Sequence, residues 1–175
     1  MEKVFISLGS NLEAERCVRE AVRRLGRVGK VLGISNVWRT EAIGGMGQDD
    51  YYNAVALVQT ELGAREVKGV LRVIEGELGR KKGRDKWAAR TIDLDIVLYG
   101  DRVIDEEGLR VPDPDIGQRG FLAMGIWELE PGLVMPGRGE RIAEIARRLG
   151  GIKMVRLEGY TRGLRAEIAQ GIESE

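Results

Sequence analysis

The 175-residue sequence contains no histidine and a single cysteine, Cys17. The absence of histidine excludes a Ser-His-Asp triad, an imidazole general base and a histidine-ligated zinc ion. One cysteine excludes an internal disulfide framework and a thiolate cluster, and it fits a reducing compartment. Any metal ion must therefore be held by carboxylates, whose oxygen atoms favour magnesium, calcium or manganese.

Aromatic residues make up only 5% of the sequence, neither charge is in excess, and long apolar runs are missing. Lysine plus arginine and aspartate plus glutamate both total 28, so the net charge gives no reason to expect a nucleic-acid or membrane partner. No apolar run approaches the roughly 18 residues of a membrane span. The first apolar run, Val4–Leu8, ends at once in Gly9-Ser10-Asn11, which is unlike a signal peptide. We expect a cytoplasmic protein of one domain, since domains span roughly 100–200 residues.

Hydrophobic periodicity predicts the order β-α-β-β-α-β for the first hundred residues. The expected strands are Val4–Leu8, Val31–Arg39, Tyr52–Thr60 and Thr91–Tyr99, and the expected helices contain Cys17–Leu25 and Ala64–Leu78. A capping box over Ser10–Glu13 is expected to start the first helix. This order is the split βαβ pattern of a ferredoxin-like α/β (α+β) fold with a mostly antiparallel sheet and helices on one face.

The C-terminal part of the chain is expected to add helices to this core. Phe121–Leu129 and Arg141–Leu149 have helical patterns, whereas the last 25 residues are weakly patterned. We therefore expect residues 1–150 to form the main domain. Residues 151–175 are an extension that belongs to the same domain or forms a tail.

The strand from Thr91 to Leu98 is the most informative segment. Alternate residues of a strand share a face, so Asp93 and Asp95 lie together on one face. Ile92, Leu94, Ile96 and Leu98 then face the core. Two carboxylates whose Cα atoms are roughly 6.5–7 Å apart repel each other unless a cation lies between them. A pair of divalent ions could serve this purpose, although so short a pattern also fits an edge strand with a solvated acidic face.

A basic loop, Gly79–Arg90, precedes this strand. Its cationic residues are Arg80, Lys81, Lys82, Arg84, Lys86 and Arg90. Cations so close to two carboxylates suggest a shared anionic ligand, and a nucleotide–metal complex fits. Trp87 could stack on a base or cover the site. Taken singly, the loop could be a solvated turn and Trp87 a packing anchor.

A second candidate region begins with the glycine-containing loop Thr40–Asp50 and continues to Asn53. The amide of Asn53 both donates and accepts, which suits the edge of a heterocycle. Tyr51 or Phe121 could stack on a flat ring. Arg119 could reach a phosphate, although each of these residues alone also fits an ordinary loop or surface position.

The run Trp87–Ile96 resembles the signature of the 6-hydroxymethyl-7,8-dihydropterin pyrophosphokinases, a family of folate-pathway enzymes. Other matching segments, in order, are Leu8–Leu12, Arg39-Thr40, Tyr51–Ala54, Gly79-Arg80, Val111-Pro112 and Arg119–Phe121. The resemblance covers roughly residues 4–150. It implies transfer of the β,γ-diphosphate of ATP to the hydroxymethyl group of 6-hydroxymethyl-7,8-dihydropterin, which gives the pterin diphosphate and AMP.

The resemblance also implies roles for individual residues. Asp93 and Asp95 would bind two Mg²⁺ ions, and Arg80 and Arg90 would act with them in catalysis. The implied ATP-site residues are Glu75, Lys82, Trp87, Ile96 and Arg119. The implied pterin-site residues are Thr40, Ile43, Gly44, Tyr51, Asn53 and Phe121. The family also leads us to expect a monomer.

The sequence departs from the family pattern at three places. Ala88-Ala89 replaces Gly-Pro, which changes the hinge options of the basic loop. Asp113 replaces a histidine that contacts ATP, and a carboxylate is unfavourable beside a triphosphate unless a cation intervenes. Glu41-Ala42 replaces a pair of prolines.

Two other functions stay open on the sequence. One is a ferredoxin-like RNA-binding module, which the scarcity of aromatic residues and the aspartates on the strand disfavour. The other is a different two-metal phosphoryl or nucleotidyl transferase.

Overall fold

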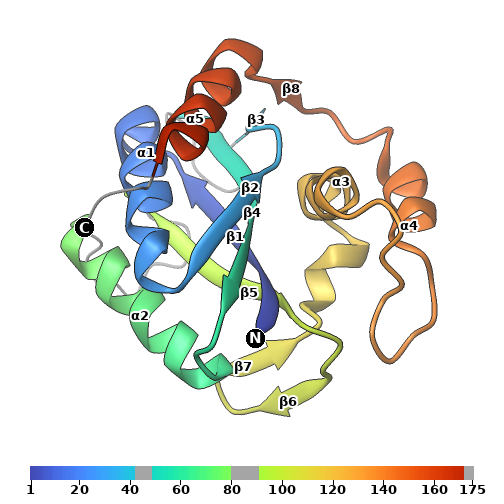
Figure 1. Ribbon diagram of the computed structural model, residues 1–175. Helices are drawn as coiled ribbons and strands as arrows, with labels where there is room; N and C mark the ends of the chain where they lie inside the picture. The colour runs from blue at the N-terminus through green and yellow to red at the C-terminus, as the bar shows by residue number, and fades with distance from the viewer. Residues whose placement is uncertain (42–48, 80–90, 172–175) are drawn as a thin grey trace.

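An antiparallel sheet runs through the centre of the computed structural model, which describes residues 1–41, 49–79 and 91–171 (Figure 1). Its strand order is β5-β1-β4-β3-β8, and β2 also pairs with β4. The strands are β1 (Glu2–Ser10), β2 (Lys30–Ile34), β3 (Trp38–Thr40), β4 (Tyr51–Thr60), β5 (Asp93–Tyr99) and β8 (Val155–Arg156). A separate hairpin joins β6 (Ile104–Glu106) to β7 (Leu109–Val111).

Helices cover both faces of this sheet (Figure 1). They are α1 (Ala14–Arg24), α2 (Ala64–Glu77), α3 (Gly120–Leu129), α4 (Ile142–Leu149) and α5 (Glu158–Gly171), with short 3₁₀ turns at Leu25–Arg27 and Pro114–Gly117. α1 and α2 pack on one face, and α3 and α4 on the other. The order and pairing of the elements confirm the predicted ferredoxin-like core with additional C-terminal helices.

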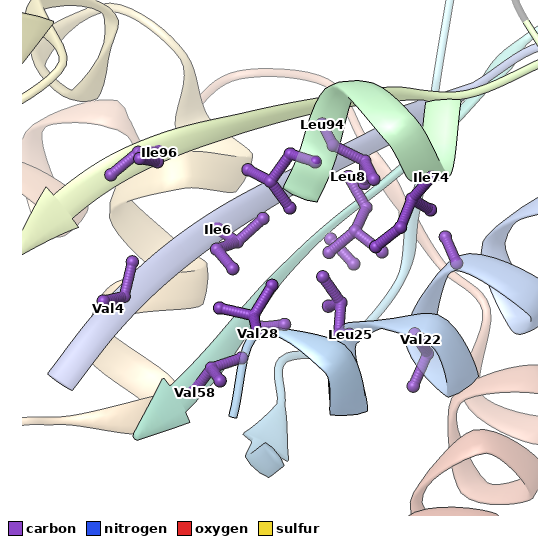
Figure 2. Packing of buried hydrophobic residues seen from close by; sticks show 14 of the residues in the cluster. Val4, Ile6, Leu8, Val22, Leu25, Val28, Val58, Ile74, Leu94 and Ile96 are labelled. Carbon is purple, nitrogen blue, oxygen red and sulfur yellow. The ribbon is translucent and has the colours of Figure 1, made fainter. Parts of the chain in front are cut away.

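Two hydrophobic cores result because alternate residues of each strand point to opposite faces. Figure 2 shows the first core, where Ile6 and Leu8 of β1 meet Leu25 and Ile74 from the helical side. The second core joins the other face of the sheet to α3 and α4. The middle of β4, residues 54–58, is buried throughout and reads as a continuous apolar run for this reason.

The predicted strand Val31–Arg39 is wrong as a single element. The structure divides it into β2 and β3, which both pair with β4. Between them the hydroxyl of Ser35 accepts a hydrogen bond from the Val55 backbone N–H (2.9 Å), so a side chain takes the place of a strand partner.

The predicted capping box at Ser10–Glu13 is also wrong. Ser10 is the last residue of β1, and its hydroxyl donates to the carbonyl oxygens of Leu12 and Thr91. Glu13 adopts a left-handed conformation (φ 49°) before α1 and makes no side-chain cap. Ser10 therefore ties the end of β1 to the residues that lead into β5.

Leu98 does not face the first core, as the simple alternation of the strand predicts. Phe5 pairs with Leu98 and Ile6 pairs with Ile96, so Val97 is an extra residue in β5. This β-bulge shifts the alternation, and Leu98 joins the second core.

Residues 155–171 pack against the rest of the domain. β8 pairs with β3, and Leu164 of α5 is 1% exposed within the first core. The Thr161 hydroxyl accepts from the Val37 N–H (2.9 Å). The helix α5 was not expected from the sequence, and the predicted boundary at residue 150 stays a prediction. Within the described ranges, no helix is long and apolar enough to cross a membrane.

Candidate active site

A glycine on a central strand opens the floor of the candidate site. In β1, Gly9 pairs with Asn53 of β4 on one side and with Asp93 of β5 on the other. A Cβ atom at Gly9 would lie 3.0 Å from the Oδ1 atom of Asn53 and 3.9 Å from a ring carbon of Tyr51. The missing side chain therefore leaves space between the Asn53 amide and the Asp93 carboxylate.

A cavity of about 470 Å³ lies over this glycine. Of the residues predicted for the site, the structure brings six to its wall: Thr40, Tyr51, Asn53, Asp93, Arg119 and Phe121. Cavities of this size hold small molecules, and a wall of two aromatic rings with a few polar groups suits a flat heterocycle.

The amide of Asn53 is held in a fixed orientation within this cavity. It is 8% exposed, and its Nδ2 atom donates to the Thr40 hydroxyl (2.7 Å). Its Oδ1 atom therefore points to the Gly9 side, as the close approach to a Gly9 Cβ shows. A buried, oriented amide of this kind can recognise the hydrogen-bonding edge of a ring.

Asp93 and Asp95 extend the site along β5, the strand at the edge of the sheet. They lie on the same face of the strand, opposite the buried Leu94. The Asp95 carboxylate accepts from the Ile96 N–H (2.9 Å), and its side chain is 51% exposed. Both aspartates therefore keep the shared face that the sequence predicts.

Lys68 of α2 is a site residue that the sequence analysis did not place. Its Nζ atom lies 3.6 Å from the Oδ1 atom of Asp95, although α2 packs on the opposite face of the sheet. The lysine side chain reaches this carboxylate around the sheet edge. The Lys68 ammonium group thus offsets negative charge at Asp95.

The carboxylate pair fits magnesium. Its oxygen atoms are hard ligands, the site is open to water, and it already attracts the Lys68 ammonium group. Among the residues that the structure describes, no group of three or more potential ligands gathers in one place. Two carboxylates are enough for magnesium, because it commonly binds one or two carboxylates together with water and substrate phosphates.

Glu75 and Ile96, both predicted for the ATP site, have structural contacts here. The Glu75 carboxylate is buried and accepts from the Leu94 N–H (3.4 Å), which supports the strand between the two aspartates. Ile96 is 2% exposed in the first core, so its side chain is not available to a nucleotide. Only its main chain could make such a contact.

Arg119 lies at the start of α3, beside a short acidic turn. Its Nε atom lies 3.2 Å from the Asp115 carboxylate, and its side chain is 58% exposed. Asp113 accepts from the Asp115 N–H (2.8 Å). Burial raises the pKa of Asp113, and the charges of Asp115 and Asp95 raise it further, whereas the Asp115 N–H and Arg119 lower it. Asp113, which replaces the histidine of the family pattern, therefore lies where its ionised form adds negative charge near Asp95.

Six predicted site residues lie outside the described residues: Ile43, Gly44, Arg80, Lys82, Trp87 and Arg90. Their proposed roles are not tested by the geometry.

The cavity also has walls that the sequence analysis missed. These are Gly9, Glu41, Gln118, Gly120 and residues 152–154. Gly9 belongs to a segment that carries the family resemblance. Gly120 belongs to another such segment, Arg119–Phe121, and Glu41 replaces a proline of the family pattern, whereas Gln118 and residues 152–154 have no sequence pattern that marks them.

The fold and the site together define a class of protein. A ring-sized cavity next to a carboxylate pair that suits magnesium is typical of a small-molecule transferase that uses a metal–phosphate complex.

Comparison with known proteins narrows this class to one family. The family model for 7,8-dihydro-6-hydroxymethylpterin-pyrophosphokinase (HPPK) matches residues 5–131. The 2-amino-4-hydroxy-6-hydroxymethyldihydropteridine pyrophosphokinase of Haemophilus influenzae is 35% identical over 161 residues, 90% of this chain and 99% of its own length. That of Aquifex aeolicus is 34% identical over 137 residues, 78% of this chain and 85% of its own.

The chain belongs to the HPPK family. Its activity is ATP-dependent pyrophosphoryl transfer to hydroxymethyldihydropterin in folate biosynthesis, and the family uses Mg²⁺. The predicted family and activity are confirmed, and this favours them over the RNA-binding alternative.

Solved structures agree on the fold. A crystal structure of an HPPK-DHPS protein in complex with substrates superposes with a TM-score of 0.67 at 11% identity, over 84% of this chain. The wild-type Plasmodium falciparum HPPK-DHPS with pteroate gives 0.67 at 12% identity. This chain spans 43% and 44% of those two chains, respectively.

Proposed function

We propose that the cavity over Gly9 binds the pterin ring, and that Asp93 and Asp95 hold two Mg²⁺ ions that carry ATP. The observation that best supports this proposal is the pairing of Gly9 with both Asn53 and Asp93. A ring recognised by the Asn53 amide would direct its substituent toward the Asp93 carboxylate. The hydroxymethyl group of the bound pterin and the diphosphate of ATP would then lie next to each other in the cavity.

The reaction under this proposal is an in-line displacement at the β-phosphorus of ATP. The pterin hydroxyl oxygen forms the new P–O bond, the bond between the β-phosphorus and the oxygen of the α-phosphate breaks, and AMP leaves with that oxygen. Magnesium, when bound, lowers the pKa of the hydroxyl and neutralises phosphate charge. Because the chain has no histidine, no imidazole can accept the hydroxyl proton.

The chain's own residues hold the two reactants for this step. The stacking surfaces are Tyr51 and Phe121, and the Thr40–Asn53 hydrogen bond fixes the amide that orients the ring. Arg119 is a phosphate contact at the cavity wall. Such positioning supplies much of the catalysis in phosphoryl transfer.

The remaining predicted roles are part of the same proposal. Arg80 and Arg90 would stabilise the transferring group, with Lys82 and Trp87 beside the nucleotide. Ile43 and Gly44 would complete the pterin side, and Glu75 and Ile96 would serve the nucleotide site through the strand that they support. We also propose a monomer that acts in the cytoplasm.

A product analysis tests the proposal. The protein is incubated with ATP, Mg²⁺ and 6-hydroxymethyl-7,8-dihydropterin, and the nucleotides are separated by chromatography. We expect AMP to appear in step with pterin diphosphate and to disappear with EDTA. Formation of ADP, or AMP release that does not depend on the pterin, would contradict the proposed reaction.

A further inference from the structure

The segment of residues 152–154 lines the cavity over Gly9. Ile152, Lys153 and Met154 all line that cavity, together with Tyr51 and Phe121. These three residues lie outside the part of the chain that matches the family model, residues 5–131.

Both ends of the segment are anchored. On one side the Ile152 N–H donates to the Leu149 carbonyl at the end of α4 (3.1 Å). On the other side Val155 pairs with Arg39 of β3, the strand that also carries Thr40 of the cavity wall. The chain must thus pass from α4 to β3 beside the start of α3, where Gly120 lies.

Gly120 lets the segment pass close to α3. A Cβ atom built at Gly120 would lie 3.4 Å from the Cβ atom of Ile152 and 3.4 Å from the Cε atom of Met154. Met154 is partly buried against the second core, which contains Phe121. Its side chain therefore lies where the second core meets the cavity.

A charge pair lies at the same cavity, beside the pairing of β3 with β8. The Nζ atom of Lys153 lies 3.4 Å from the carboxylate of Glu41, which follows β3 and also lines the cavity. Both side chains are largely exposed, so the pair is a weak contact. It joins the C-terminal segment to the residue that follows β3.

We propose that residues 152–154 form the outer wall of the pterin site and that Met154 contacts the bound ring. A flexible, polarisable thioether packs well against a flat aromatic surface. This inference rests on the proposed function, because it assumes that the ring binds over Gly9. Its consequence is that affinity for the pterin depends on Met154 whereas affinity for the nucleotide does not.

The test measures the Kd of 6-hydroxymethyl-7,8-dihydropterin by calorimetry, with Mg²⁺ and α,β-methylene-ATP present. This analogue cannot react, since the methylene group replaces the bridging oxygen at which transfer cleaves ATP. We expect Met154→Ala to raise the pterin Kd roughly tenfold, the scale of lost apolar contact in a pocket, and Met154→Leu to restore most of it. In both variants the Kd of α,β-methylene-ATP should stay within about twofold of that of the unaltered chain, since Met154 is not expected to contact the nucleotide.

Met124→Ala is the matched control, because Met124 is also partly buried against the second core but is not part of the cavity wall. If Met154→Ala changes the pterin Kd no more than Met124→Ala does, the inference is wrong. Lys153→Glu provides a test that does not depend on core packing, since Lys153 is exposed. This substitution should raise the pterin Kd a few-fold, and the double variant E41K/K153E, which exchanges the two charges, should reverse the effect. An unchanged Kd in Lys153→Glu would contradict the proposal that residues 152–154 form the outer wall.

The two proposals fail in different ways. If the unaltered chain binds no pterin, or forms no AMP from ATP and pterin, the proposed function itself is wrong. If the unaltered chain binds and turns over pterin while Met154→Ala binds it equally well, only the outer wall is wrong.

Discussion

Replacing Asp95 with asparagine should strongly lower the rate of catalysis while it leaves the fold intact. The asparagine Oδ1 atom can still accept from the Ile96 N–H, so the local backbone keeps its partner. The ion pair with Lys68 is lost, but the aspartate side chain is 51% exposed. Such a pair contributes about 0–1 kcal/mol, and the loss of repulsion from Asp93 offsets part of this. The melting temperature should therefore change by less than about 4 °C.

The effect on function should be far larger. A ligand that touches the metal matters more than the groups that support it, and removal of supporting groups already lowers affinity or activity about 10–100-fold. We therefore expect Asp95→Asn to lower kcat/KM by more than about 100-fold. The affinity for Mg²⁺ with α,β-methylene-ATP, measured by calorimetry, should fall in parallel.

Asp105→Asn is the matched control. Asp105 lies in the β6–β7 hairpin, is 76% exposed, and forms an ion pair with Arg110 (3.7 Å). It therefore loses the same kind of contact away from the site and should keep near-normal kinetics. Turnover of Asp95→Asn within tenfold of the unaltered chain would refute the metal role, and a large drop in its melting temperature would make Asp95 a structural residue instead.

Three other substitutions test separate parts of the structure. Gly125→Ala should lower the free energy of unfolding by about 1–3 kcal/mol in urea titrations, because its Cβ atom would lie 2.6 Å from Val55 between α3 and β4. Gly9→Ala should raise the KM for the pterin about tenfold or more with little change in melting temperature, because the new methyl group enters the cavity and its nearest neighbours, Asn53 Oδ1 at 3.0 Å and a Tyr51 ring carbon at 3.9 Å, are side-chain rather than backbone atoms. Asp113→Asn should raise the melting temperature at pH 7. Because burial raises the pKa of Asp113 above 3.8, ionisation destabilises the fold as the pH rises through that pKa, and the difference should shrink as the pH falls toward 3.8.

The core of the fold could be predicted from the sequence because its signals are local. The alternation of β1 and the helical spacing of α2 each place their apolar residues without knowledge of the partner. The division between β2 and β3 could not be predicted, since no local pattern in the run Val31–Arg39 marks the point where the Ser35 hydroxyl accepts from the Val55 N–H of β4. The helix α5 is similarly hidden, because few of its side chains are buried and its apolar face is narrow.

The site divides along the same line. Residues at the cavity that lie within a motif, such as Asn53 and Phe121, could be named from the sequence. Lys68 and Met154 could not be named from the sequence. Lys68 reaches Asp95 around the edge of the sheet, and Met154 lines the cavity only because the C-terminal segment folds back against it. A lysine on a helix and a methionine near the C-terminus carry no local sign of such a contact.

The register between β1 and β5 determines whether the carboxylate pair exists at all. The pairs Gly9–Asp93 and Ser7–Asp95 are regular, and the bulge at Val97 begins only after them. An extra residue placed between the two aspartates would turn one of them toward the first core, because each added residue reverses the face of all that follow. The bulge instead falls where both neighbouring faces are buried, so it changes which core receives Leu98 and Tyr99. The irregularity that made the prediction for Leu98 wrong thus leaves Asp93 and Asp95 on the face where Gly9 opens the cavity.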